Sequence, residues 1–281
     1  MSTLQTSSDT PFIRVAPLSR WPEVDWRGIW EARELLTFLV WRRRSVRYRR
    51  TALGAGWAII PPLTTMLVFT IFFGHVVKIS SQGLPYPVFY LTALVPWNYF
   101  SRALGDAMDS LPSNQQLLNR VYFPRIILPL SSVLSQLIDL AIAMAMLIAV
   151  LLFYRIVPSW RLLFLPPFIL LAIASSLGAG MWLGAVNVRF RDVRFAAASL
   201  IRSWMFVSPV VYPSSLVRGR WRILYEVNPM AGVIDGFRWV FTGVAAPSPL
   251  LLAISFMSGA ILLACGFFYF NKLEGEFADE V

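Results

Sequence analysis

Long apolar runs alternate with short polar segments along most of this 281-residue chain. A helix needs about 20 mostly apolar residues to cross the hydrocarbon core of a bilayer. Six segments approach that length, and the fifth, which contains Ser208 and Pro209, is the shortest. The predicted spans are residues 57–77, 86–104, 126–154, 162–188, 195–211 and 250–270. The pattern therefore predicts an all-α integral membrane protein with six transmembrane helices in a domain of residues 51–281.

The segment before the first span divides in two. Residues 1–25 are polar and rich in Ser, Thr and Pro, so we expect a flexible cytoplasmic tail. Residues 26–50 place apolar side chains, two of them Trp26 and Trp30, at helical spacing between charged ones. Tryptophan on such a face favours an interfacial amphipathic helix in the cytoplasmic headgroup layer. The alternative is a helix that covers other parts of the protein.

Arginine indicates the orientation of the spans. Six arginines lie within the nine residues 42–50, shortly before the first span. Basic residues beside a span resist translocation, so this side is cytoplasmic. With an even number of spans, both termini then lie in the cytoplasm. The short loops predicted to be outside carry few basic residues, which are Lys78, Arg155 and Arg161.

The cytoplasmic loop 102–125 contains a predicted docking element. Pro112-Ser113-Asn114 can start a helix, and Phe123-Pro124 can end one over residues 115–122. A short helix with an apolar side on this face of a membrane protein favours a partner protein, although it could simply pack under the bundle. The candidate docking residues are Asn114, Gln115, Leu117, Leu118, Arg120, Val121 and Tyr122.

The segment 212–249 is amphipathic. Asn228-Pro229 is a strong helix start, and the helix 230–242 that follows is too short to cross a bilayer. Half-helices at membrane depth are tolerated where protein buries them or where they line a water-filled path. We therefore expect re-entrant half-helices on the outer side, with gate candidates Asn228, Pro229, Asp235 and Arg238.

Composition excludes several functions. The net charge of +10 could indicate nucleic acid, but most arginines flank apolar spans, where they serve topology and bind lipid headgroups. We therefore expect membrane lipid and no nucleic acid. His75 is the only histidine and Cys265 the only cysteine, so neither a disulfide within the chain nor a His/Cys metal site is expected.

The chain also lacks an energy source of its own. It has no Gly-Lys dipeptide and hence no P-loop for ATP phosphates. Asp139 is the only acid inside a predicted span. Such an acid is a functional candidate by default, or else a hydrogen-bond partner between helices. Because paired intramembrane acids are missing, the sequence implies an energising partner.

Five motifs, in this order and against these spans, carry a family resemblance. They are Arg-Tyr-Arg-Arg-Thr-Ala-Leu-Gly at 47–54 before Trp57, Asn-Arg-Val-Tyr-Phe-Pro-Arg at 119–125, Arg-Phe-Arg-Asp-Val at 189–193, Ser-Pro-Val-Val-Tyr-Pro at 208–213 and Asn-Pro-Met at 228–230. From about Arg33 onward, the chain resembles the permease subunit of type-2 ABC exporters, in the branch that exports lipid-linked O-antigen or teichoic acid.

The resemblance implies partners and roles. We expect a homodimer in the bacterial inner membrane, with two separate P-loop ATPase subunits that hold ATP and Mg²⁺. This chain would then have no catalytic residues and no cofactor. The helix at 115–122 would be the coupling helix, the helix at 26–41 would lie at the interface, and the segment 212–242 would form the outer gate. The cargo would be a glycan linked to a polyisoprenyl diphosphate.

Such a cargo suggests two residue sets. Aromatic rings can stack on sugar faces without fixing a register; the candidates are Tyr86, Phe89, Tyr90, Trp97, Tyr99, Phe100, Trp204, Phe206 and Tyr212. Interfacial belts and core packing are the alternative. Arginine can bind a diphosphate with two parallel hydrogen bonds. The candidates at the cytoplasmic entrance are Arg47, Arg49, Arg50 and Arg191, for which a topological role is equally reasonable.

Two other functions compete. One is a type-2 ABC permease for a drug or a lipid. The other is a membrane-embedded enzyme acting on glycan lipids, which needs clustered acids or histidine at the interface. Asp106, Asp109 and Asp192 are the only acids available for that role, and no metal-binding spacing surrounds them.

Overall fold

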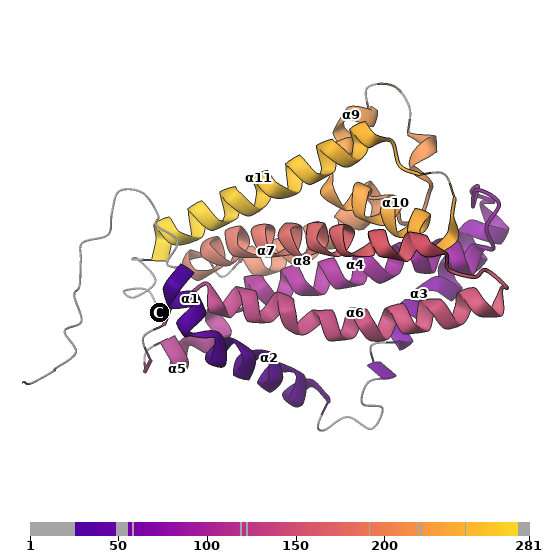
Figure 1. Cartoon of the computed structure of the whole chain (residues 1–281). Coiled ribbons are helices and arrows are strands. Elements are labelled where there is room, and N and C mark those ends of the chain that lie inside the picture. Colours follow the sequence, from indigo (N-terminus) through magenta and orange to yellow (C-terminus); the bar gives the residue numbers. More distant parts are fainter. Residues whose placement is uncertain are drawn as a thin grey trace, which may run out of the picture.

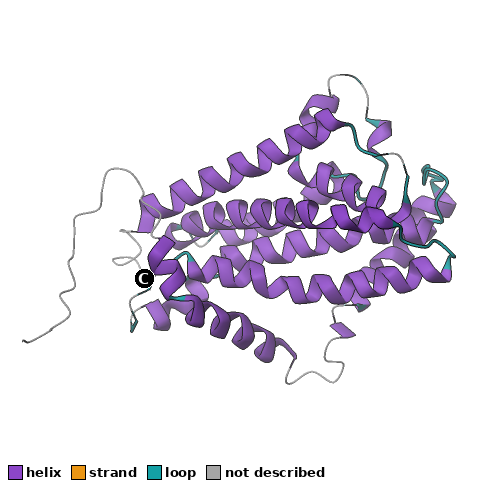
Figure 2. Ribbon diagram, in the orientation of Figure 1, coloured by secondary structure: helices purple, strands orange, loops and turns teal. Residues whose placement is uncertain are grey.

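The computed structural model describes residues 26–48, 56–57, 59–118, 120–121, 123–190, 192–217, 219, 221–244 and 246–274. Every regular element within those ranges is helical, which confirms the all-α class (Figures 1 and 2). The elements are α1 (Trp26–Glu31), α2 (Arg33–Tyr48), α3 (Ile60–Phe69), η2 (Thr70–Val76), α4 (Tyr86–Met108), η3 (Pro112–Asn114), α5 (Gln115–Leu118), α6 (Ile127–Phe153), η4 (Trp160–Phe164), α7 (Leu165–Arg189), α8 (Val193–Val207), η5 (Ser214–Leu216), α9 (Trp221–Glu226), α10 (Pro229–Thr242) and α11 (Pro249–Glu274).

The long helices form an elongated bundle. α4 lies between α6 and α7, and α11 packs along the other side of α7 (Figure 1). The short helices α1, α2 and α5 lie at one end, and α9 and α10 lie at the other. Within the described residues, three helices are long and apolar enough to cross a membrane, namely Ile127–Phe153, Trp160–Arg189 and Pro249–Leu273.

The other three predicted spans are also helical, but they differ in kind. Residues 60–76 form α3 and then the π-helical η2, a shorter apolar helix. α4 is 23 residues long and is buried almost all round, as expected for a central helix. α8 ends at Val207 because Pro209 disfavours helical backbone at Ser208, whose φ and ψ are −96° and 156°.

Two glycines allow α7 and α11 to approach closely. A Cβ added to Gly178 would meet the carbonyl carbon of Leu262 at 2.6 Å, and one added to Gly266 would collide with the carbonyl group of Gly178. Small residues let helix backbones meet in membranes, where no hydrophobic force drives helices together. Close van der Waals contact between α7 and α11 therefore depends on this pair.

The predicted amphipathic helix at 26–50 is two helices, α1 and α2, interrupted at Ala32. α2 packs on α6 and buries Leu39, while Phe38 and Trp41 face outward from it. Apolar side chains therefore occupy both faces, one against protein and one open. The predicted tail, residues 1–25, lies outside the described residues.

Candidate functional site

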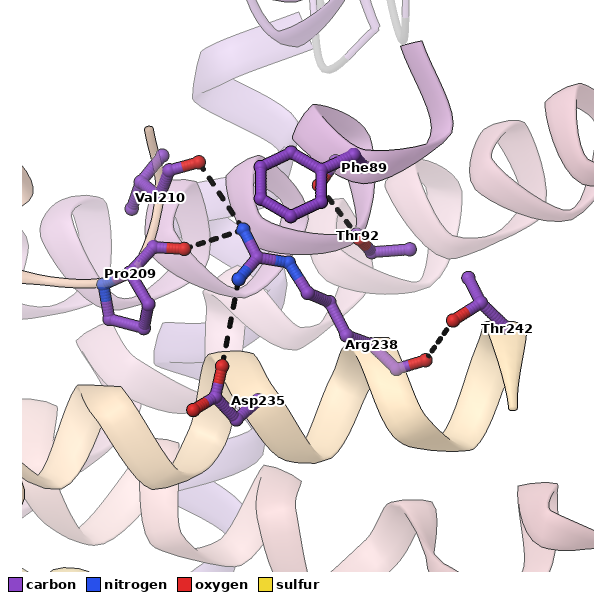
Figure 3. Close-up of polar contacts among 7 residues, drawn as sticks. All are labelled: Phe89, Thr92, Pro209, Val210, Asp235, Arg238 and Thr242. Carbon is purple, nitrogen blue, oxygen red and sulfur yellow. Dashed lines mark hydrogen bonds and ion pairs between the residues drawn. The ribbon is translucent and has the colours of Figure 1, made fainter. Parts of the chain in front are cut away.

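The end of the bundle that carries α10 is organised around Arg238. This side chain is only 3% exposed, and it donates from Nη2 to the carbonyl oxygens of Pro209 at 2.5 Å and Val210 at 3.4 Å (Figure 3). Its Nη1 lies 3.5 Å from Oδ1 of Asp235, one turn back on α10. The guanidinium carbon lies 3.8 Å from the centre of the Phe89 ring on α4. One cation thus joins α10, the segment after α8, and α4.

A second junction forms where α10 begins. The Asn228 side chain caps α10 by accepting from the Met230 amide at 3.0 Å. The same oxygen accepts from Nε1 of Trp204 at 3.1 Å, and the Asn228 amide group donates to Oγ of Ser208 at 2.9 Å. Trp204 in turn packs edge-on against Phe100 of α4, with ring centres 5.1 Å apart. The cap therefore fixes the last turn of α8 to the first turn of α10.

These junctions bring the four predicted gate residues onto one short helix. Asn228 caps it, Pro229 occupies its first turn, and Asp235 and Arg238 form its ion pair. Pro229, Asn228 and Arg238 are buried. The end of α8 and the whole of α10 are consequently tied into one unit.

The nine predicted channel aromatics fall into a buried group and a more exposed group. Five of the rings pack between helices inside the chain: Phe89, Tyr90, Trp97, Tyr99 and Phe100. In this structure those five rings lie between helices and are at most 4% exposed. Tyr86, Trp204 and Tyr212 are partly buried, and Phe206 is 55% exposed. A substrate contact by these four remains a prediction.

The open face of α8 includes Arg202, which the sequence pattern did not single out. α8 packs through Ala197 and leaves Phe195 and Leu200 exposed. Arg202 is also exposed, and among the described residues it makes no hydrogen bond or ion pair. It lies two residues before Trp204, whose partner Phe100 is well inside α4. The available signal was an arginine within the fifth apolar run.

The opposite end of the bundle carries the predicted docking element. The α-helix is the single turn Gln115–Leu118 rather than the expected two turns over 115–122, and a 3₁₀ turn precedes it. Leu117 and Leu118 are partly buried against the core, whereas Gln115, Arg120 and Val121 are exposed. Asn114 donates its side-chain amide to the carbonyl of Ser110 at 2.8 Å. Tyr122 lies outside the described residues.

Polar contacts brace this end. Asp109, which follows α4, lies 3.3 Å from Nε of Arg194 on α8 and accepts from the Asn187 amide on α7 at 3.4 Å. Partial burial raises the pKa of the Asp109 carboxyl, and the Arg194 charge opposes that rise. The ends of α4, α7 and α8 therefore meet beside the helical turn Gln115–Leu118 and the residues that follow it, called the docking turn below.

The four entrance arginines cannot be placed. Arg49, Arg50 and Arg191 lie outside the described residues, and so does the side chain of Arg47. Asp139 has a partner on another helix, since its Oδ2 lies 3.9 Å from Nη1 of Arg102. This supports the prediction of an interhelical polar contact. Within the described residues, no group of three or more His, Cys, Asp or Glu could hold a metal ion.

Comparison with known proteins identifies the family. Residues 34–242 match the family described as ABC-2 type transporter. The O-antigen export system permease protein RfbA of Myxococcus xanthus is 29% identical over 91% of this chain and 98% of its own length. A permease of the same name from Klebsiella pneumoniae is 25% identical, over 88% of this chain and 94% of its own length. The polysialic acid transport protein KpsM of Escherichia coli is 25% identical, over 69% and 76%. Because the family match covers most of the chain, this protein belongs to the ABC-2 type transporter membrane family.

Proposed function

We propose that this chain is the membrane subunit of an ATP-driven exporter that moves a lipid-linked polysaccharide, of O-antigen or teichoic-acid type, out of the cytoplasm. The observation that carries the proposal is the similarity to O-antigen export permeases along almost the whole chain. A permease for a drug or a lipid is the weaker candidate. The relatives named only as an inner membrane transport permease share 23% identity over 73% of this chain.

The proposed topology has six spans. Three are the long apolar helices. The others are the helix Ile60–Val76, the buried α4, and α8, which stops short of the outer surface where Pro209 follows it. α9 and α10 then form the re-entrant outer segment. Arginine-rich residues 42–50 favour a cytoplasmic position for both termini.

Energy would come from two P-loop ATPase subunits carrying ATP and Mg²⁺. The chain has no P-loop sequence, so hydrolysis belongs to a partner. We place the contact with the ATPase at the docking turn, because Val121 exposes an apolar side chain there, next to the exposed Arg120. At the same end of the bundle, the ion pair between Asp109 and Arg194 joins the end of α4 to α8. Force applied there would reach α8 directly.

A homodimer would enclose the path. An exposed charge at membrane depth normally faces a water-filled cavity or the interior of a bundle rather than lipid. Arg202 lies on the same open face of α8 as Phe195 and Phe206, seven residues before it and four after it. Two copies of the chain related by a twofold axis would place these faces opposite each other, across a path for a charged, amphipathic cargo.

The proposal is tested by purifying the chain from its native membrane in mild detergent and identifying the co-purifying proteins by mass spectrometry. We expect a P-loop ATPase in one-to-one ratio, and loss of surface polysaccharide when the gene is deleted. A partner-free chain would remove the energy source. Drug sensitivity with normal surface glycan would favour the other permease class.

A further inference from the structure

A polar cavity opens beside α10, at the end of the bundle opposite the docking turn. Its volume is about 490 Å³, within the range of small-molecule sites in proteins. Its wall comes from the loop before α4, η5 with the residues that follow it, α9, α10, the loop before α11 and the first turn of α11. Its polar lining includes Arg222, Tyr225, Glu226, Asp235 and Arg238.

Buried polar atoms of this wall lack hydrogen-bond partners. The Tyr225 side chain is only 5% exposed, and its hydroxyl makes no hydrogen bond. Arg238 is 97% buried, and its Nε and Nη1 donate no hydrogen bond, although Nη1 is ion-paired with Asp235. A buried polar group without a partner costs roughly 1–3 kcal/mol, so it requires an explanation. These atoms have almost no accessible surface, so a ligand with several hydroxyl groups would satisfy them only when the wall side chains shift on binding.

The charges of the described wall cancel in pairs. Arg222 lies 2.8 Å from Glu226, and Arg238 lies 3.5 Å from Asp235. A phosphate or other anion would have to compete with a carboxylate for each guanidinium. A sugar hydroxyl both donates and accepts, so it can bind a carboxylate, a guanidinium and a phenol together. The wall thus suits an uncharged, hydroxyl-rich ligand.

We propose that this cavity binds a neutral sugar residue of the exported glycan on the outer side of the membrane. The inference rests on the proposed function and adds a second kind of glycan contact to it. Aromatic stacking lets a chain slide, whereas fixed donors and acceptors hold one sugar in a defined register. Arg238 also donates to the carbonyl groups of Pro209 and Val210, so a ligand in the cavity would contact a side chain that joins α10 to the segment after α8.

The test uses the permease in complex with its ATPase in lipid nanodiscs. Saturation-transfer NMR is recorded with the methyl glycosides of glucose, galactose, mannose and rhamnose, and with that of glucuronic acid as the charged comparison. Tyr225→Phe removes only the unpartnered hydroxyl, so the protein should fold normally. Tyr154→Phe is the matched control, because Tyr154 is an exposed tyrosine at the end of α6, outside the cavity wall and outside the predicted substrate contacts.

We expect at least one neutral glycoside to bind, with affinity falling about five- to tenfold in Tyr225→Phe and staying unchanged in Tyr154→Phe. Absence of binding by every neutral glycoside, equal affinity in Tyr225→Phe and the unmodified complex, or tighter binding of the glucuronide would each overturn the inference. Failure of the proposed function looks different. In that case the gene deletion leaves surface polysaccharide intact, whatever the glycosides do.

Discussion

The guanidinium of Arg238 stacks on the Phe89 ring at 3.8 Å, in the buried interior where α10 meets α4. The two residues are far apart in sequence and on different helices, yet the charge has few other partners. It faces one carboxylate, that of Asp235, and two backbone carbonyls from the segment after α8. A single arginine thereby holds together α10, the segment after α8, and α4.

Removing this charge should destabilise the outer end. Arg238→Met leaves Asp235 buried without its counter-ion, and breaking one partner of a buried pair costs roughly 3–5 kcal/mol. The midpoint of thermal unfolding in detergent should therefore fall. Arg238→Met combined with Asp235→Leu removes both charges and should recover much of the loss. A double variant as unstable as the single one would show that the contact with Phe89 dominates.

The close contact of α7 and α11 predicts a sharp steric effect. Gly266→Leu forces a side chain into the backbone of Gly178, and overpacking of this kind costs roughly 1–3 kcal/mol even where neighbours can move. Unfolding temperature and yield should both drop. Gly105→Ala on α4 is the control, since a Cβ there meets nothing within 4 Å. That change should be neutral or should stabilise the helix by about 0.5–1 kcal/mol.

A substitution at Val121 tests whether the docking turn contacts the ATPase. Its side chain is 49% exposed, so Val121→Asp leaves the bundle intact while placing a charge on the surface that would meet the ATPase. We expect the ATPase to be lost on purification and surface polysaccharide to disappear. Val157→Asp makes the same change at an exposed valine between α6 and η4, and export should continue. Normal export by Val121→Asp would place the contact elsewhere.

Asp139 should matter less than the docking turn. It lies 3.9 Å from Arg102, at the long end of ion-pair distances, and asparagine keeps an oxygen able to accept from that arginine. Asp139→Asn should therefore export close to the unmodified level, measured as surface polysaccharide per cell. A variant complex that assembles correctly but exports nothing would assign this acid a direct part in transport.

Substitutions at Arg202 distinguish whether the open face of α8 lines a hydrated path or contacts lipid. If α8 lines a hydrated path, Arg202→Leu should lower export about tenfold or more, and Arg202→Lys should keep much of it because the charge remains. Both variants should still bind the ATPase. If the face contacts lipid instead, Arg202→Leu removes a costly charge, so the unfolding temperature should rise while export stays unchanged.

The sequence by itself determined the helical class, the presence of a helix in each of the six apolar runs, the start of α10 and the resemblance to type-2 ABC exporters. These depend on the lengths of apolar runs and on local cap chemistry, as when Asn228 accepts from the Met230 amide two residues later. The extent of the docking helix was predicted less well. Turn chemistry marked its start, but the α-helix found is one turn long.

Only the tertiary structure decided which side chains are available for function. Phe89 and Phe206 are both aromatic residues in apolar segments, but the first is fully buried and the second is 55% exposed. Lipid is as apolar as a leucine side chain, so the sequence pattern does not distinguish an apolar residue that faces lipid from one that faces protein. Contacts between distant segments, such as Arg238 with Phe89 and Trp204 with Asn228, likewise form only when the helices pack.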